Sequence, residues 1–205
     1  MTIDCIRNEG YVSCKSSFYS ALDSLSHSLC FSFSPGINKL VGEIDSGNWA
    51  VSYLLSMYRH RPEDFVLFDP PKVVVNKKEL SLNSFSRFSC YMDLSDPLFS
   101  FDGSLEGMIQ KGLEENGLNY SPDDVRALFQ IDADRFNRPL TAVGNEIFKA
   151  MAAIGYSYKK EFFCFPWLSN KRLKSYHENL TFALRMLENL GKTVILPVGA
   201  ETPHI

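Results

Sequence analysis

The C-terminal half of the chain alternates helix and strand patterns, and this order constrains the fold more than any other feature. Gly144–Tyr158 has apolar residues at the spacing of one helix face, and Glu161–Phe165 is a short apolar run typical of a buried strand. A second helix pattern over Lys171–Leu190 ends at Gly191, and Thr193–Val198 is a final apolar strand. Units of this kind pair their strands in parallel in a sheet covered by helices. The sequence therefore predicts an α/β fold.

The N-terminal half is richer in strand patterns. Up to about Phe33, serines interleave with aromatic residues, which favours loose β structure with turns. After the turn Ser34-Pro35-Gly36, the run Ile37–Val41 predicts a strand, and Trp49–Tyr58 predicts a buried helix. Further strands are predicted at Phe65–Phe68, Lys72–Val75 and Phe88–Met92. This half therefore predicts an antiparallel β section that leads into the parallel sheet.

Between the two halves, residues 104–130 have a helical pattern. Ser121-Pro122-Asp123-Asp124 is typical of a helix start, with a capping serine, proline at the first helical position and acids in the first turn. With 205 residues, two large domains are not expected. We therefore expect a single domain over residues 1–205, with a reduced helical subdomain at about residues 100–140.

Composition excludes several classes of function. The formal net charge of −3 leaves no excess of Lys and Arg for phosphates, so nucleic acid is not an expected partner. The longest apolar runs, around Trp49–Tyr58 and Phe162–Leu168, are shorter than the roughly 20 residues that span a bilayer. The start of the chain lacks an apolar signal core, so a cytoplasmic location is expected.

The cysteines and histidines predict no metal centre. Five scattered cysteines contain no C-x-x-C pair, and the four histidines have no metal-ligand spacing. Cys164 lies in an apolar run, which favours a core position over a nucleophile. His177 is expected at the surface, and the pairs Lys159-Lys160 and Lys171-Arg172 are expected to be solvated helix ends rather than a phosphate clamp.

The segment Gly42–Trp49 is the strongest candidate site. It connects a strand to a helix, and Gly42 and Gly47 have the spacing of a loop whose backbone N–H groups bind phosphate at a helix N-terminus. Two glycines at this spacing also occur in ordinary tight turns, so the loop alone decides nothing.

Other segments, taken in order, resemble ATP-binding cassette (ABC) ATPase domains of the P-loop NTPase superfamily. The stretch from Ala21 through the Pro-Gly turn to Gly47 is similar to the family's start, and Cys90–Phe99 to its glutamine-bearing switch loop. Gly144-Asn145-Glu146 and the helix after it resemble the signature helix, and FFCFPWLS resembles the Walker B strand. The segment LENLGKTVILPVG resembles the closing helix and strand. The resemblance implies a P-loop NTPase-like parallel sheet flanked by helices.

The chain departs from this family at the positions that bind phosphate and magnesium and that activate water. The resemblance places the phosphate-binding lysine at Asn48 and the magnesium-binding hydroxyl at Trp49. Glu43 and Asp45 put two carboxylates in the loop, and two like charges ~4 Å apart cost about 4 kcal/mol at an effective dielectric constant of about 20. The metal-associated Asp falls at Pro166 and the general-base Glu at Trp167.

The remaining motifs are eroded as well. The switch glutamine falls near Asp93 or Leu94, and the signature serine-glycine pair is reduced to roughly Val143-Gly144-Asn145. The switch histidine falls near Gly199. No catalytic or metal-binding residue is therefore expected, and Gly42, Asp45, Ser46, Gly47, Asn48 and Trp49 form only a degenerate phosphate loop.

Both tryptophans occupy positions where the family contacts magnesium or water. We expect Trp49 and Trp167 at the carboxyl ends of neighbouring strands, where parallel sheets bind ligands. With Pro166 they would plug the nucleotide cavity or form an apolar contact for a partner. Alternatively, each tryptophan packs into its own local core.

The resemblance implies a pseudo-ATPase that acts as a binding or regulatory subunit, accessory to an ABC transport system and without a cofactor. Its partner would be a second copy or another ABC ATPase subunit. A membrane permease is a further partner, which would hold the chain at the inner face of the membrane. Two alternatives stay open: an ATP-binding protein with weak hydrolysis, which would use ATP and magnesium, and a nucleotide-independent scaffold.

Overall fold

The computed structural model describes residues 3–8, 12–13, 29–42, 48–60, 66–67, 72–100 and 102–199. Within them, the strands are β1 (Ile3–Asn8), β2 (Val12–Ser13), β3 (Leu29–Phe33), β4 (Gly36–Val41), β5 (Val66–Leu67), β6 (Lys72–Val75), β7 (Lys78–Leu80), β8 (Ser89–Tyr91), β9 (Phe162–Cys164) and β10 (Thr193–Val198). The α-helices are α2 (Asn48–Met57), α3 (Leu82–Phe85), α4 (Leu105–Glu115), α5 (Pro122–Leu128), α6 (Ala133–Phe136), α7 (Ile147–Ser157) and α8 (Asn170–Asn189). Short 3₁₀ turns are η3 (Tyr58–His60), η4 (Pro97–Phe99), η5 (Leu140–Ala142) and η6 (Gly144–Glu146).

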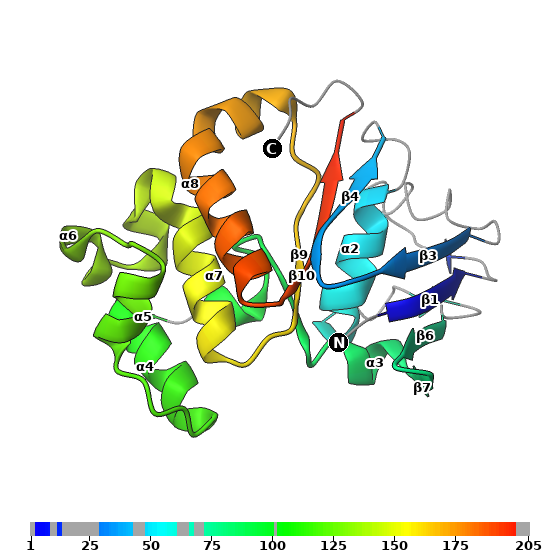
Figure 1. Ribbon diagram of the computed structural model, residues 1–205, viewed down its shortest axis with the longest axis horizontal. Coiled ribbons are helices and arrows are strands. Elements are labelled where there is room, and N and C mark those ends of the chain that lie inside the picture. Colours follow the sequence, from blue (N-terminus) through cyan, green and yellow to red (C-terminus); the bar gives the residue numbers. More distant parts are fainter. Residues whose placement is uncertain are drawn as a thin grey trace.

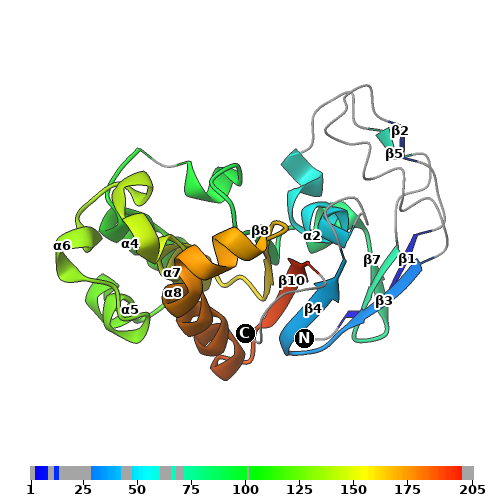
Figure 2. The same cartoon turned by 90° about the horizontal axis from the view of Figure 1, so that it is seen from above.

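A four-stranded parallel sheet forms the centre of the fold, in the order β4-β10-β9-β8 (Figure 1). All six residues of β10 are buried, because β10 lies inside the sheet and both faces of the sheet are covered. Helices α7 and α8 lie on one side of this sheet, and α2 lies on the other (Figure 2). The predicted α/β fold class, a parallel sheet flanked by helices, is confirmed.

A second sheet is antiparallel, in the order β3-β1-β6-β7, and lies beyond α2 (Figure 2). This is the predicted N-terminal β section. Strand β7 of this sheet and the short helix α3 that follows it were not predicted. The hairpin between β6 and β7 turns through Asn76 and Lys77, both with positive φ. The expected β structure between residues 14 and 28 lies outside the described residues.

Two hydrophobic clusters fill the spaces on the two faces of the parallel sheet. One joins the sheet to α4, α7 and α8, and the other joins it to α2, α3 and the antiparallel sheet. Neighbouring residues of one strand alternate between them: Phe163 belongs to the first cluster, and Phe162 and Cys164 to the second. Cys164 has no exposed surface, so its predicted core position is confirmed.

Capping residues that are recognisable in the sequence fix where several helices begin and end. Ser121 begins α5 with a capping box, in which its hydroxyl accepts the Asp124 N–H and the Asp124 carboxylate accepts the Ser121 N–H. Helix α8 ends as predicted at Gly191, whose φ is +69°. There the Gly191 and Lys192 N–H groups donate to the Glu188 and Leu187 carbonyls, a pattern that a left-handed glycine allows. The helices α4, α5 and α6 lie within the range predicted for the helical subdomain.

Candidate functional site at the carboxyl edge of the parallel sheet

The carboxyl ends of all four parallel strands meet at one edge of the sheet, where α/β folds bind ligands. Four chain segments leave the sheet here: the glycine loop after β4, the residues after β9, the loop after β8 and Gly199 after β10. The predicted site residues fall on the first two of these segments.

The glycine loop begins and ends at described residues. Gly42 follows β4, and its N–H donates to the Val198 carbonyl at 2.9 Å. Asn48 begins α2, and its side-chain Nδ2 donates to the Val41 carbonyl at 3.0 Å. The structure thus places Asn48 against the end of β4. Asp45, Ser46 and Gly47, together with Glu43, lie outside the described residues, so repulsion between the loop carboxylates stays a prediction.

Trp167 lies across the end of β10. Its indole Nε1 donates to the Gly42 carbonyl at 3.1 Å, and the two residues are 125 positions apart in the chain. The next residue, Leu168, forms a parallel bridge to Val198. Trp167 and Pro166 are both half-buried. A proline and an indole offer no carboxylate to a metal ion or to an attacking water.

The two tryptophans do not follow neighbouring strands, and this prediction was wrong. Trp49 follows β4 and Trp167 follows β9, while β10 lies between those strands. The strand order of a parallel sheet depends on its crossovers and is not written in the chain order. Trp49 is half-buried, and its ring meets Tyr53 edge-on, with the ring centres 6.2 Å apart. Trp167 nevertheless reaches the glycine loop, because its indole spans the intervening strand.

The loop after β8 is held by a buried carboxylate that the sequence reasoning missed. Asp96 is only 3% exposed. Its Oδ2 accepts the Tyr91 N–H at 2.7 Å and its Oδ1 accepts the Leu98 N–H at 2.9 Å. The sequence signal for this role is Asp96-Pro97, because an aspartate before proline commonly caps the first turn of a helix. Of the residues predicted near the switch glutamine, Asp93 is half-buried and Leu94 is 44% exposed.

The predicted remnant of the signature motif, Val143-Gly144-Asn145, forms the 3₁₀ turns before α7. A network of buried charges begins at the next residue. The Lys149 ammonium donates to Glu146 Oε1 at 2.7 Å, and both side chains are about nine-tenths buried. Glu146 Oε2 accepts the Asp132 N–H at 3.2 Å and lies 3.9 Å from Arg135 Nη1. Every charge of this network has a partner within the protein.

Lys160 corrects another prediction. It was expected at a solvated helix end, but it is only 6% exposed, and its Nζ donates to the Arg87 carbonyl at 2.7 Å. Burial lowers the pKa of Lys160. Its acceptor lies 73 residues earlier in the chain, so no local sequence pattern predicts the contact. Lys159 and His177 are exposed, as predicted.

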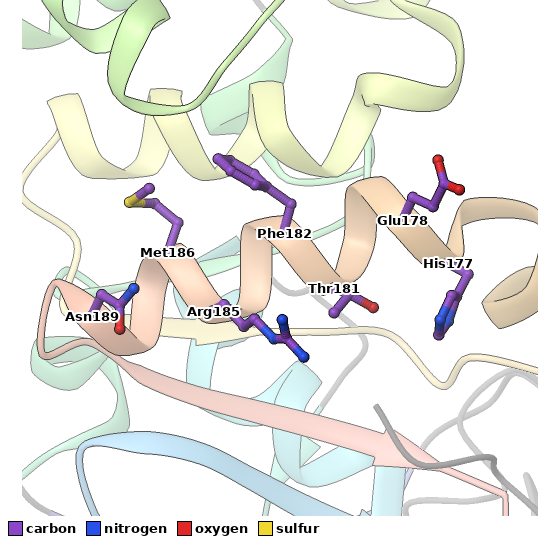
Figure 3. Close-up of a pocket in the computed structure, with 7 residues that line it drawn as sticks. All are labelled: His177, Glu178, Thr181, Phe182, Arg185, Met186 and Asn189. Atoms are coloured by element: carbon purple, nitrogen blue, oxygen red, sulfur yellow. The ribbon is translucent and has the colours of Figure 1, made fainter.

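Two shallow grooves lie elsewhere. One, of about 450 Å³, runs along α8 and is lined by His177, Glu178, Thr181, Phe182, Arg185, Met186 and Asn189 (Figure 3). The other, of about 570 Å³, is lined by Arg59, His60, Pro97, Leu98, Ser100, Asp102, Lys111, Glu115 and Tyr158. Their linings mix charges of both signs, so neither favours a ligand of one charge.

Metal and membrane features can be judged only for the part of the chain that the structure describes. There, no three His, Cys, Asp or Glu side chains gather in a way that could hold a metal ion. Among the described helices, none has the length and apolar character needed to cross a bilayer.

Comparison with known proteins identifies the fold. No model of a known protein family matches the chain, and no curated protein matches its sequence. The structure is similar to a putative ABC transporter ATP-binding protein from Pyrococcus furiosus, with a TM-score of 0.62 and 11% identity, over 100% of this chain and 93% of that one.

Two further solved structures agree. An ATP-binding subunit of an ABC transporter matches with a TM-score of 0.57 and 9% identity, over 97% of this chain and 80% of that one. A bacterial Atm1-family ABC exporter with ATP bound matches with a TM-score of 0.60 and 11% identity, over 96% of this chain and 35% of the exporter chain. At these identities the likeness establishes the fold, which is that of ABC transporter ATP-binding subunits.

Proposed function

We propose that this protein is a non-hydrolytic member of the ABC ATPase fold that works by binding a protein partner. The observation that carries the proposal is the hydrogen bond from Trp167 to Gly42, because it puts an indole across the sheet edge where a nucleotide would bind. The amide of Asn48 and the ring of Trp49 add neither a cation for phosphate nor a hydroxyl for magnesium.

The apolar character of this edge supports a protein partner. Val41 at the end of β4 is 59% exposed and Leu94 after β8 is 44% exposed, although large apolar side chains are usually buried. The half-buried rings of Trp49 and Trp167 add aromatic surface of the kind that is enriched in protein contacts. The partner we propose is a second copy or another ABC ATPase subunit, and through it a membrane permease at the inner face of the membrane.

Nucleotide titration tests the proposal. Adding MgATP while following tryptophan emission is expected to give no saturable change, because Trp167 fills the edge. Thermal unfolding gives an independent measurement, since a ligand at 100 times its dissociation constant stabilises the folded state by about 2.7 kcal/mol. A saturable response at micromolar MgATP would refute the plugged site.

The two alternatives predict different results. An ATP-binding protein with weak hydrolysis binds MgATP and releases phosphate above a buffer blank, using the backbone N–H groups of the glycine loop. A scaffold binds neither nucleotide nor an ATPase partner. Co-purification with the partner from the native host separates the scaffold from the proposed subunit.

A further inference from the structure

Two side chains at the degenerate positions form hydrogen bonds to consecutive carbonyls at the start of the glycine loop. Asn48 Nδ2 donates to the Val41 carbonyl at 3.0 Å, and Trp167 Nε1 donates to the Gly42 carbonyl at 3.1 Å. The donors come from the start of α2 and from the segment after β9. Two distant parts of the chain therefore hold one short stretch of backbone.

The backbone around these carbonyls is fixed as well. The Val41 carbonyl and the Gly42 N–H belong to one peptide group, and that N–H donates to the Val198 carbonyl at 2.9 Å. On the other side of β10, the Leu168 N–H donates to the Pro197 carbonyl at 3.3 Å. Asn48 thus holds one end of a peptide group whose other end is paired to β10. Trp167 holds the next peptide group from a segment that is itself paired to β10.

We propose that Asn48 and Trp167 form a clamp, defined by these two side chains, that holds the start of the glycine loop in one position without any ligand. An amide and an indole are neutral donors, so the clamp needs neither a bound anion nor a particular pH. The role of the clamp rests on the proposed function, because it makes the sheet edge a fixed surface for a partner rather than a nucleotide-responsive one.

Hydrogen exchange of the Gly42 amide, measured by NMR on the full chain, tests the clamp. Trp167→Phe keeps an aromatic ring and removes the donor, and Asn48→Ala removes the other donor. Each variant is expected to accelerate Gly42 exchange about fivefold, the effect of one lost hydrogen bond of about 1 kcal/mol. Because the two carbonyls lie on adjacent peptide groups, the double variant is expected to exchange at nearly the rate of either single variant.

Three results would overturn the clamp. They are unchanged exchange in both single variants, a double-variant effect equal to the product of the single effects, and slower Gly42 exchange in the unmodified protein when MgATP is added. Asn119→Ala, in the exposed connection after α4, is the matched control and should leave Gly42 exchange unchanged. Circular dichroism confirms that each variant is folded.

The same measurement separates the clamp from the proposed function. If MgATP binds the unmodified protein while Gly42 exchange stays constant, the plugged site of the proposed function fails and the clamp stands. If MgATP does not bind and the variants leave exchange unchanged, the role stands and the clamp fails.

Discussion

The start of α7 holds paired charged side chains, whereas three key positions at the carboxyl edge of the parallel sheet hold uncharged ones. At α7, Glu146 and Lys149 are buried and fully paired. At the sheet edge, the positions that resemble a phosphate and metal site hold Asn48, Pro166 and Trp167, none of which is ionisable. The chain can therefore build and satisfy a buried charge network. The lack of charge at these three positions is therefore not imposed by the fold.

The energetic consequences differ as well. A buried ion pair is costly to break, because removing one partner leaves the other charge desolvated. A neutral hydrogen bond, such as that of Trp167, contributes only about 0.5–1.5 kcal/mol net. We therefore expect the α7 network to dominate stability and the sheet edge to tolerate change. Substitutions in the two regions test this difference.

The largest expected effect follows Glu146→Ala. Lys149 would stay buried without its carboxylate, and removing one partner of a buried pair costs about 3–5 kcal/mol. Urea unfolding followed by tryptophan emission measures the change. The matched control is Glu115→Ala, which breaks the exposed pair with Lys111, where a loss of about 0.5 kcal/mol or less is expected. Equal losses in the two variants would remove the distinction between the regions.

A middle effect is expected from Asp96→Ala, at the end of β8. The substitution leaves the N–H groups of Tyr91 and Leu98 without their acceptor, which costs about 1–3 kcal/mol. Asp93→Ala is the control, because the Asp93 carboxylate is half-buried and accepts the Ser95 N–H. The same unfolding measurement should rank the Asp96 variant between the Glu146 variant and the Asp93 control. A ranking of Asp93 above Asp96 would contradict this account of the loop.

Sequence patterns predicted the parts of the fold that are local. The six-residue strand Thr193–Val198 was predicted with its observed bounds, because an apolar run follows a helix-ending glycine. The capping box at Ser121 was likewise visible in four consecutive residues. Strand β7 was missed because Lys78–Leu80 is short and mostly charged, so it carries no apolar pattern.

The hydrogen bonds of the candidate site could not be predicted from local sequence patterns. Asn48 and Trp167 could be placed at the degenerate positions, but their acceptors could not be named. The Trp167–Gly42 bond joins residues 125 positions apart and depends on a strand order that puts β10 between β4 and β9. Lys160 was placed at the surface because its acceptor belongs to another strand connection. Hydrogen bonds between residues far apart in the chain cannot be predicted from local patterns in one sequence.

The smallest expected effect is a pH dependence at His60, which lies near both Asp96 and Lys160. Burial, and then the adjacent Arg59 charge, lower the pKa of His60 from 6.5. Arg59 Nε donates to His60 Nε2 at 2.6 Å, a bond that requires the neutral ring. The unfolded chain therefore binds more protons just below pH 6.5, and the free energy of unfolding should rise as the pH rises through that window. Urea midpoints for the unmodified protein and His60→Gln, measured on both sides of the window, should show a smaller pH slope in the variant. An equal slope would mean that His60 does not contribute to the pH dependence of stability.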